Sequence, residues 1–134
     1  MIESPSVYLC GPFDYYHDPF NWRWDIERDY DWINWVNPSD KFPEYTSGNK
    51  QEVVDWCLGK AAECDFLFLR WDEQTVTVGT FMEYGIALEN DTEIVCWWIG
   101  DYSPSPFIEC TASLISLEAD ECVSYIAKRA EGII

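Results

Sequence analysis

Phe66-Leu67-Phe68-Leu69 is the stretch of this 134-residue chain that decides its fold. The run is bounded by Asp65 and Arg70, and four consecutive apolar residues of this kind suit a strand that is covered on both faces. The segments on either side of it, Gln51 to Cys64 and Gly79 to Asn90, are expected to be helices. A buried strand between two helices predicts a parallel sheet with helical crossovers.

The same alternation extends toward both ends of the chain. The further elements that we expect are strands at Ser6 to Cys10, Ile33 to Val36, Glu93 to Trp98 and Ser113 to Leu117, and helices at about Trp22 to Tyr30 and Glu118 to Glu131. The stretches 39–48, 72–78 and about 100–110 are predicted to be loops. A chain of this length makes one core, so residues 1–134 are expected to form a single α/β domain. Its predicted architecture is a three-layer sandwich with a five-stranded, mainly parallel sheet of the Rossmann or flavodoxin-like kind.

Charge is the outlier of the composition. Twenty-five Asp and Glu stand against eight Lys and Arg, which gives a net charge of −17. Nucleic acids and anionic membranes are bound through clustered cations, so the chain is expected to bind neither. Excess carboxylate weakens a compact state, but molar salt shortens the screening length to about 3 Å. We therefore interpret the acidity as that of a halophile's protein; an acidic interaction surface is the alternative.

The cysteines predict a reduced protein without a metal. Six of them are scattered along the chain without a C-x-x-C pair, and His17 is the single histidine. Zinc sites need close ligand pairs, so we expect no metal and no cofactor. The N-terminal residues lack the basic start and apolar run of a signal peptide, and no apolar run approaches the length that spans a bilayer. These features favour a cytoplasmic protein.

Ligands of parallel α/β sheets bind at the carboxyl ends of the strands. This rule selects the segments after Cys10, Asn37, Leu69 and Ile99. The candidate site residues in and around these segments are Tyr8, Gly11, Pro12, Phe13, Arg23, Asp55, Trp71, Asp72, Thr77, Gly79 and Glu83.

Glu83 is the most informative candidate. On a helix that starts near Gly79, it shares a face with Gly79 and Ala87, and these small neighbours leave room for a ligand to approach the carboxylate. The alternative is structural: Thr80-Phe81-Met82-Glu83 fits a capping box, in which Glu83 would bond back to the cap's own backbone. The other candidates also have structural alternatives. Tyr8 would be a core residue with a satisfied hydroxyl, and Asp65 would be a turn residue. Arg23 would form a surface ion pair, and the aromatic residues would pack in the core or in loops.

The order of motifs resembles that of the nucleoside 2-deoxyribosyltransferase superfamily, which also includes nucleoside 5′-monophosphate N-glycosidases. The motifs run from about Val7 to Trp98: Val7-Tyr8-Leu9-Cys10-Gly11-Pro12, Trp22-Arg23, Val36-Asn37-Pro38, Ala62-Glu63-Cys64-Asp65 and Gly79-x-x-x-Glu83-x-Gly85-x-Ala87. The last of these is the family's fingerprint.

The resemblance implies that Glu83 is a nucleophile that attacks the anomeric carbon of a nucleoside and holds the sugar as a covalent ester. Tyr8 matches the tyrosine that orients this glutamate. Transfer of the 2-deoxyribosyl group to a second base would complete a retaining double displacement. A carboxylate near a helix N-terminus is expected to stay ionised.

Two positions depart from the family pattern. The acidic residue that contacts the base lies eight positions before the Asp65 equivalent, and here that position is Cys57. Asp55, two residues earlier, can take this role only if the helix is shifted or irregular, because two positions rotate a side chain by about 200°. Six residues before the nucleophile, where many relatives carry Asp or Ser, the chain has Thr77.

The resemblance leaves the substrate and the reaction open. Few cations near the strand ends favour a neutral nucleoside, with Phe13, Tyr15 or Trp71 stacking on the base, while Arg23 and Arg70 would suit a nucleotide. The alternatives to base transfer are a hydrolytic N-glycosidase acting on nucleoside 5′-monophosphates and a binding module of low activity. Relatives are dimers or larger, so we expect at least a homodimer, with residues 107–113 as the stretch that would complete a neighbour's site.

Overall fold

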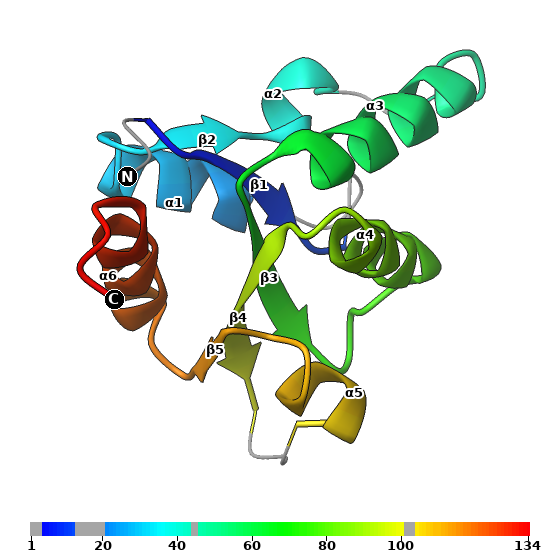
Figure 1. The fold of residues 1–134 in the computed structure, drawn as a ribbon. Coiled ribbons are helices and arrows are strands. Elements are labelled where there is room, and N and C mark those ends of the chain that lie inside the picture. Colours follow the sequence, from blue (N-terminus) through cyan, green and yellow to red (C-terminus); the bar gives the residue numbers. More distant parts are fainter. Residues whose placement is uncertain (1–3, 13–20, 44–45, 101–103) are drawn as a thin grey trace.

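One parallel sheet organises the protein (Figure 1). The computed structural model describes residues 4–12, 21–43, 46–100 and 104–134. The described strands are β1 (Ser6–Cys10), β2 (Asn34–Val36), β3 (Phe66–Asp72), β4 (Glu93–Ile99) and β5 (Leu114–Ser116). They lie in the order β2-β1-β3-β4-β5, and each neighbouring pair is parallel. This is the flavodoxin-like order, which confirms the predicted α/β fold and puts the topological switch point between β1 and β3.

The central strand β3 is longer than predicted. The apolar run ends at Leu69, but the strand continues through Arg70, Trp71 and Asp72 because β4 pairs with it along all seven residues, as far as Asp72 opposite Ile99. The parallel partner therefore carries the ladder past the point where the apolar signal stops.

Helices cover both faces of the sheet (Figure 1). The four longer ones are α1 (Trp22–Asp29), α3 (Lys50–Glu63), α4 (Val78–Glu89) and α6 (Ala119–Ala130). Strand residues alternate between the two sides: Val7 and Leu9 of β1 pack with α1 and α6, while Tyr8 and Cys10 pack with α3 and α4. This alternation follows from the period of two of a strand and makes the three predicted layers.

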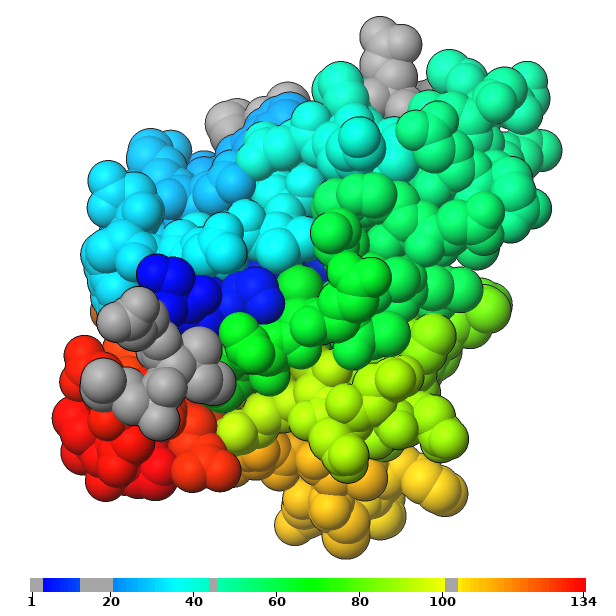
Figure 2. Space-filling model, turned by 45° about the horizontal axis from the view of Figure 1, so that its top comes forward, coloured from blue at the N-terminus to red at the C-terminus, as the bar shows by residue number. Residues whose placement is uncertain are grey.

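Two single-turn helices replace parts of predicted loops. Helix α2 (Pro38–Lys41) and helix α5 (Pro106–Glu109) each begin with a proline after a capping residue. Asn37 Oδ1 accepts from the amide of Ser39 at 2.8 Å, and Ser105 Oγ accepts from the amide of Phe107 at 3.2 Å. A polar cap followed by proline is a favoured helix start, so these turns have a local cause. Figure 2 shows α3, α4 and α5 following one another from top to bottom across one face.

No helix in the described ranges combines the length and the apolar composition needed to cross a bilayer.

Candidate active site

Glu83 lies in the second turn of α4 and is buried, with 6% of its surface exposed. Helix α4 is capped by Thr77, whose Oγ1 accepts from the amide of Thr80 at 3.5 Å. Thr80 is therefore inside the helix, and the capping-box interpretation of Glu83 is wrong. A Cβ placed on Gly79 would lie 4.0 Å from Glu83 Oε1, so the carboxyl reaches back toward the small residue of the first turn.

Tyr8 is the group that Glu83 faces. The side chain of Tyr8 is fully buried on β1. Tyr8 Oη and Glu83 Oε2 both lack a hydrogen-bond partner of good geometry among the described residues, although the two groups are close enough to influence each other. Burial, and after it the charge of Glu83, raises the pKa of Tyr8 well above its ordinary value. The phenol is therefore a neutral O–H that can donate, and its hydroxyl is not satisfied as in an ordinary core position.

Burial also controls the ionisation of Glu83. It raises the pKa of this carboxyl to about 7, while the Tyr8 hydroxyl and the positive charge of Arg23 act in the opposite direction. The sequence-based expectation of a firmly ionised carboxylate does not hold, because removal from water outweighs the position near the start of a helix. Glu83 is thus divided between its two protonation states near neutral pH.

Helix α3 brings Cys57, and not Asp55, to this pair. The helix is continuous over Lys50–Glu63, so the shift that Asp55 would need is absent. Asp55 is exposed, and its Oδ1 accepts from Gln51 Nε2 at 2.8 Å. Cys57 is buried beside Tyr8, and burial raises the pKa of its thiol to about 11. A neutral thiol therefore occupies the position where the resembled family has an acid. The spacing of eight residues between Cys57 and Asp65 predicts this substitution from the sequence.

The turn after β1 is held by the first turn of α1. Gly11 is tightly packed, since a Cβ there would lie 2.8 Å from Trp22 Cζ2. Arg23 is 2% exposed and donates to three backbone carbonyls: Nε to Leu9 at 3.2 Å, Nη2 to Gly11 at 2.7 Å and Nη1 to Pro12 at 3.2 Å. Arg23 is therefore not a surface ion pair, and the structure turns its guanidinium toward the chain itself.

The end of β3 supplies Trp71 and Asp72. The ring of Trp71 stacks on Trp98, with centroids 5.4 Å apart and planes at 9°, and meets Phe81 edge-on at 5.7 Å. Asp72 is half-buried, and its Oδ1 accepts from the amide of Gln74 at 3.1 Å. Trp71 also lines a hollow of about 480 Å³ on the α5 side of α4, together with Thr80, Phe81, Tyr84, Gly85, Leu88, Ser105, Phe107, Ile108 and Thr111.

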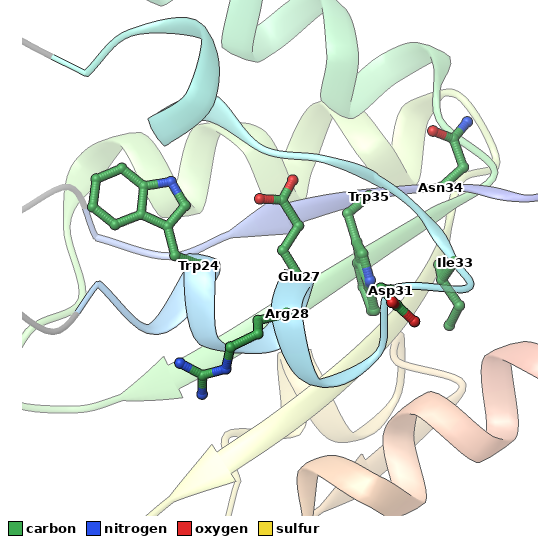
Figure 3. Close-up of a pocket in the computed structure, with 7 residues that line it drawn as sticks. All are labelled: Trp24, Glu27, Arg28, Asp31, Ile33, Asn34 and Trp35. Atoms are coloured by element: carbon green, nitrogen blue, oxygen red, sulfur yellow. The ribbon is translucent and has the colours of Figure 1, made fainter.

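A second hollow, of about 470 Å³, lies beside α1 and β2 (Figure 3). Figure 3 shows the Glu27 carboxyl between Trp24 and Trp35, with the Arg28 side chain pointing away from it. Burial and a hydrogen bond with Asp40 raise the pKa of Glu27 to about 7. This hollow does not include Glu83, which belongs to the layer of α3 and α4.

Phe13, Tyr15 and His17 lie outside the described residues. Within the described ranges, no three His, Cys, Asp or Glu side chains come together as a metal site would require. Asp65 is at the other end of β3, where its Oδ2 accepts from the amide of Ser6 at 2.9 Å, as expected of a turn residue.

The comparisons with known proteins concern the fold. No protein-family model matches the chain, and no curated protein sequence matches it. Among solved structures, a 2-deoxyribosyltransferase from the psychrotolerant bacterium Bacillus psychrosaccharolyticus is similar with a TM-score of 0.71 and 15% identity, over 87% of this chain and 88% of that one. The Clostridium botulinum CMP N-glycosidase BcmB is similar with a TM-score of 0.58 and 15% identity, over 91% and 98%.

A conserved protein from Enterococcus faecalis V583 is also similar, with a TM-score of 0.53 and 13% identity over 91% of this chain and 87% of that one. The chain shares their fold. Two of these three proteins are named as enzymes that act on nucleosides or nucleotides.

Proposed function

We propose that the chain is a member of the nucleoside 2-deoxyribosyltransferase superfamily and moves a 2-deoxyribosyl group between nucleobases through a covalent glycosyl–Glu83 intermediate. The observation that carries this proposal is the buried carboxyl of Glu83 next to the phenol of Tyr8, at the side of the sheet where α4 begins. The likeness in fold to a 2-deoxyribosyltransferase supports it.

The proposed reaction has two balanced steps. In the first, a carboxylate oxygen of Glu83 bonds to C1′ as the C1′–N bond breaks; the bond's electron pair leaves with the base, which takes up a proton. In the second, a ring nitrogen of the incoming base bonds to C1′, the ester bond breaks and Glu83 is a carboxylate again, while the incoming nitrogen releases its proton. Configuration at C1′ is retained because it is inverted twice. The Tyr8 hydroxyl orients the Glu83 carboxylate before the first step and donates a hydrogen bond to it again after the second.

The source of the leaving group's proton remains part of the proposal. Asp55 is exposed and paired with Gln51, and the thiol of Cys57 holds its proton too tightly to be an effective acid near neutral pH. Asp72, half-buried at the end of β3, is the described carboxyl that we assign to this task, with water as the alternative donor.

The placement of the cations supports an uncharged nucleoside as the substrate. Three nitrogens of Arg23 donate to backbone carbonyls, and the guanidinium of Arg70 lies between the rings of Trp22 and Trp97, 5.8 and 5.4 Å from their centroids. Both cations are thus engaged within the protein rather than presented to a phosphate. Gly11, Pro12, Thr77 and Gly79 remain the proposed contacts of the sugar, with Phe13 and Trp71 proposed for the base.

The deciding experiment is incubation with deoxyinosine and adenine in high salt, with separation of the products. Formation of deoxyadenosine supports transfer, and release of hypoxanthine independent of adenine would mean hydrolysis instead. Repeating the assay with a deoxynucleoside 5′-monophosphate tests the N-glycosidase alternative, which the likeness in fold to the CMP N-glycosidase favours. Binding without turnover would leave a nucleoside-binding module.

The matched controls are on one helix. Glu83→Ala should abolish the reaction, whereas Glu89→Ala, at the exposed end of α4, should not change it. Loss of activity in both variants, or in neither, would contradict the role given to Glu83.

We also propose a homodimer that uses the α4–α5 face. The hollow there has no charged residue among its described lining, and Phe107 at α5 is 83% exposed. Two copies that each carry −17 repel each other least where the surface is uncharged, so this apolar face is the favourable one. Phe107→Glu should therefore dissociate the dimer in sedimentation at high salt, while Trp32→Glu, exposed after α1, should not. A wild-type protein that sediments only as a monomer would remove the proposal.

Finally, we propose that the protein works in the salt-accumulating cytoplasm of a halophile, since its net charge of −17 would destabilise a compact chain in dilute buffer.

A further inference from the structure

Arg23 is a buried cation in a strongly acidic protein. It is the second residue of α1 and is 2% exposed. A charge removed from water is costly unless hydrogen bonds and an opposite charge compensate it. The described contacts of its guanidinium explain what holds it there.

The backbone supplies the hydrogen bonds. The carbonyls of Leu9, Gly11 and Pro12 accept from three different nitrogens, at 2.7–3.2 Å. Leu9 is in β1, directly after Tyr8, and Gly11 and Pro12 follow the carboxyl end of the strand. The planar guanidinium has donors on three nitrogens and can reach three fixed carbonyls at once, whereas the single ammonium nitrogen of lysine cannot.

Trp22, the residue before Arg23, also holds the segment after β1 in place. Trp22 packs so closely on Gly11 that a Cβ there would lie 2.8 Å from its ring, and the guanidinium carbon of Arg23 is 4.8 Å from the centroid of the same ring. The first turn of α1 is itself fixed, because Asn21 Oδ1 accepts from the amide of Arg23 at 3.0 Å. These contacts join the first turn of α1 to the end of β1.

We propose that Arg23 is a positioning residue of the Glu83 site: its guanidinium fixes the end of β1, and with it the Tyr8 phenol in the place where it meets Glu83. The inference rests on the proposed function for its catalytic meaning and gives Arg23 a task other than binding substrate. Electrostatics supports it, since the Arg23 charge lowers the pKa of Glu83 across the strand end. Among the described residues, Tyr8 and Cys10 on β1 and Cys57 on α3 are also in electrostatic contact with Glu83.

The test follows the ionisation of Glu83 directly, by carboxyl ¹³C chemical shift in protein labelled at glutamate, with the signal assigned through Glu83→Gln. In Arg23→Met the titration midpoint should move up by about one pH unit. In Arg28→Met it should stay in place, because Arg28 on the same helix is exposed and pairs with Asp25 and Asp29. A folded Arg23→Met variant with an unchanged midpoint would overturn the proposal.

Arg23→Lys separates charge from positioning, and it keeps the proposal testable if Arg23→Met does not fold. The lysine retains the charge but cannot hold three carbonyls, so base exchange should fall at least tenfold in kcat. The midpoint should rise less than in Arg23→Met, because only the effect of the displaced Tyr8 hydroxyl is lost. Full activity of Arg23→Lys would contradict the positioning role. A rise in KM confined to 5′-monophosphate substrates, with kcat and midpoint unchanged, would instead make Arg23 a binding residue. The titration needs no substrate, so a shifted midpoint in a protein without glycosyl transfer would reject the proposed function and leave the electrostatic link between the two residues standing.

Discussion

The Tyr8 phenol lies against the Glu83 carboxyl in the interior of the protein, where the first is fully buried and the second almost so. Each changes the other's proton affinity: the carboxylate raises the pKa of the phenol, and the phenol lowers that of the carboxyl. Burial of Glu83 is the larger effect and leaves its pKa near 7. The stability and the activity of the protein should therefore depend on pH through the same group.

Stability should decline as Glu83 ionises. Its pKa rises from 4.5 to about 7 on folding, so the folded state holds the proton more tightly than the unfolded chain. This contribution is complete below pH 4.5 and is lost as pH rises through 7. Glu83→Gln, which stays neutral, should thus be more stable than the wild type at pH 8.5 by about 3 kcal/mol. Urea unfolding from pH 5.5 to 8.5, at constant high salt, measures the difference, which should shrink toward the acid end. An advantage of Glu83→Gln that is constant across this range would mean that the carboxyl is not buried as described.

Activity should have an acid limb near pH 7. The nucleophile must be ionised, so kcat/KM for base exchange is expected to fall tenfold for each pH unit below the pKa of Glu83. Tyr8→Phe removes the hydroxyl that lowers this pKa, and the limb should then move to higher pH. The deficit of the variant would be largest at pH 6 and smaller at pH 9. If Tyr8→Phe lost the same factor at every pH, Tyr8 would act through geometry alone.

The thiols should differ sharply in reactivity. All six cysteines are free, and Cys110 is exposed while the other five are buried. Burial raises the pKa of Cys57 and of Cys64 to about 11, and that of Cys96 and of Cys122 to about 12. Because the thiolate is the reactive form, an aromatic disulfide reagent at pH 8 should label one thiol rapidly in the native protein and six after denaturation. Cys110→Ser should abolish the rapid phase. A rapid phase that remains in this variant would show that at least one of the five buried thiols is open to solvent.

Salt should stabilise the fold. Raising KCl from 0.1 to 2 M shortens the screening length from about 10 Å to less than 3 Å, which removes much of the repulsion among 25 carboxylates. Tm should rise by roughly 4 °C for each kcal/mol of repulsion removed. Neutralising exposed acids, as in Glu73→Gln combined with Glu89→Gln, should flatten the dependence. A Tm that does not respond to salt would count against the halophile interpretation.

The fold could be predicted because its signals are local. Phe66 to Leu69 is buried on both faces, as four apolar residues in a row require, and the longer helices lie where the alternation of segments put them. The single-turn helices α2 and α5 were not predicted, because four residues are too few to show a helical period. Their first residues, Asn37-Pro38 and Ser105-Pro106, also resemble turns.

The site could be predicted less completely. The spacing of Gly79 and Glu83 pointed to the carboxyl, since both are on one helix. Its high pKa depends instead on burial, and Tyr8, which the fold brings from far along the chain, lowers it. The contacts of Arg23 could not be foreseen, because backbone carbonyls leave no mark in a sequence.

The stack of Trp71 on Trp98 gives the protein an optical reporter of its own. Two nearly parallel indoles 5.4 Å apart share their electronic transitions, so their near-ultraviolet circular dichroism depends on how the rings are oriented. Trp71 lies at the carboxyl end of β3, beside the first turn of α4, and a ligand that turned this ring would alter the dichroic band without any label. Binding to a catalytically silent variant could then be followed in the spectrum alone.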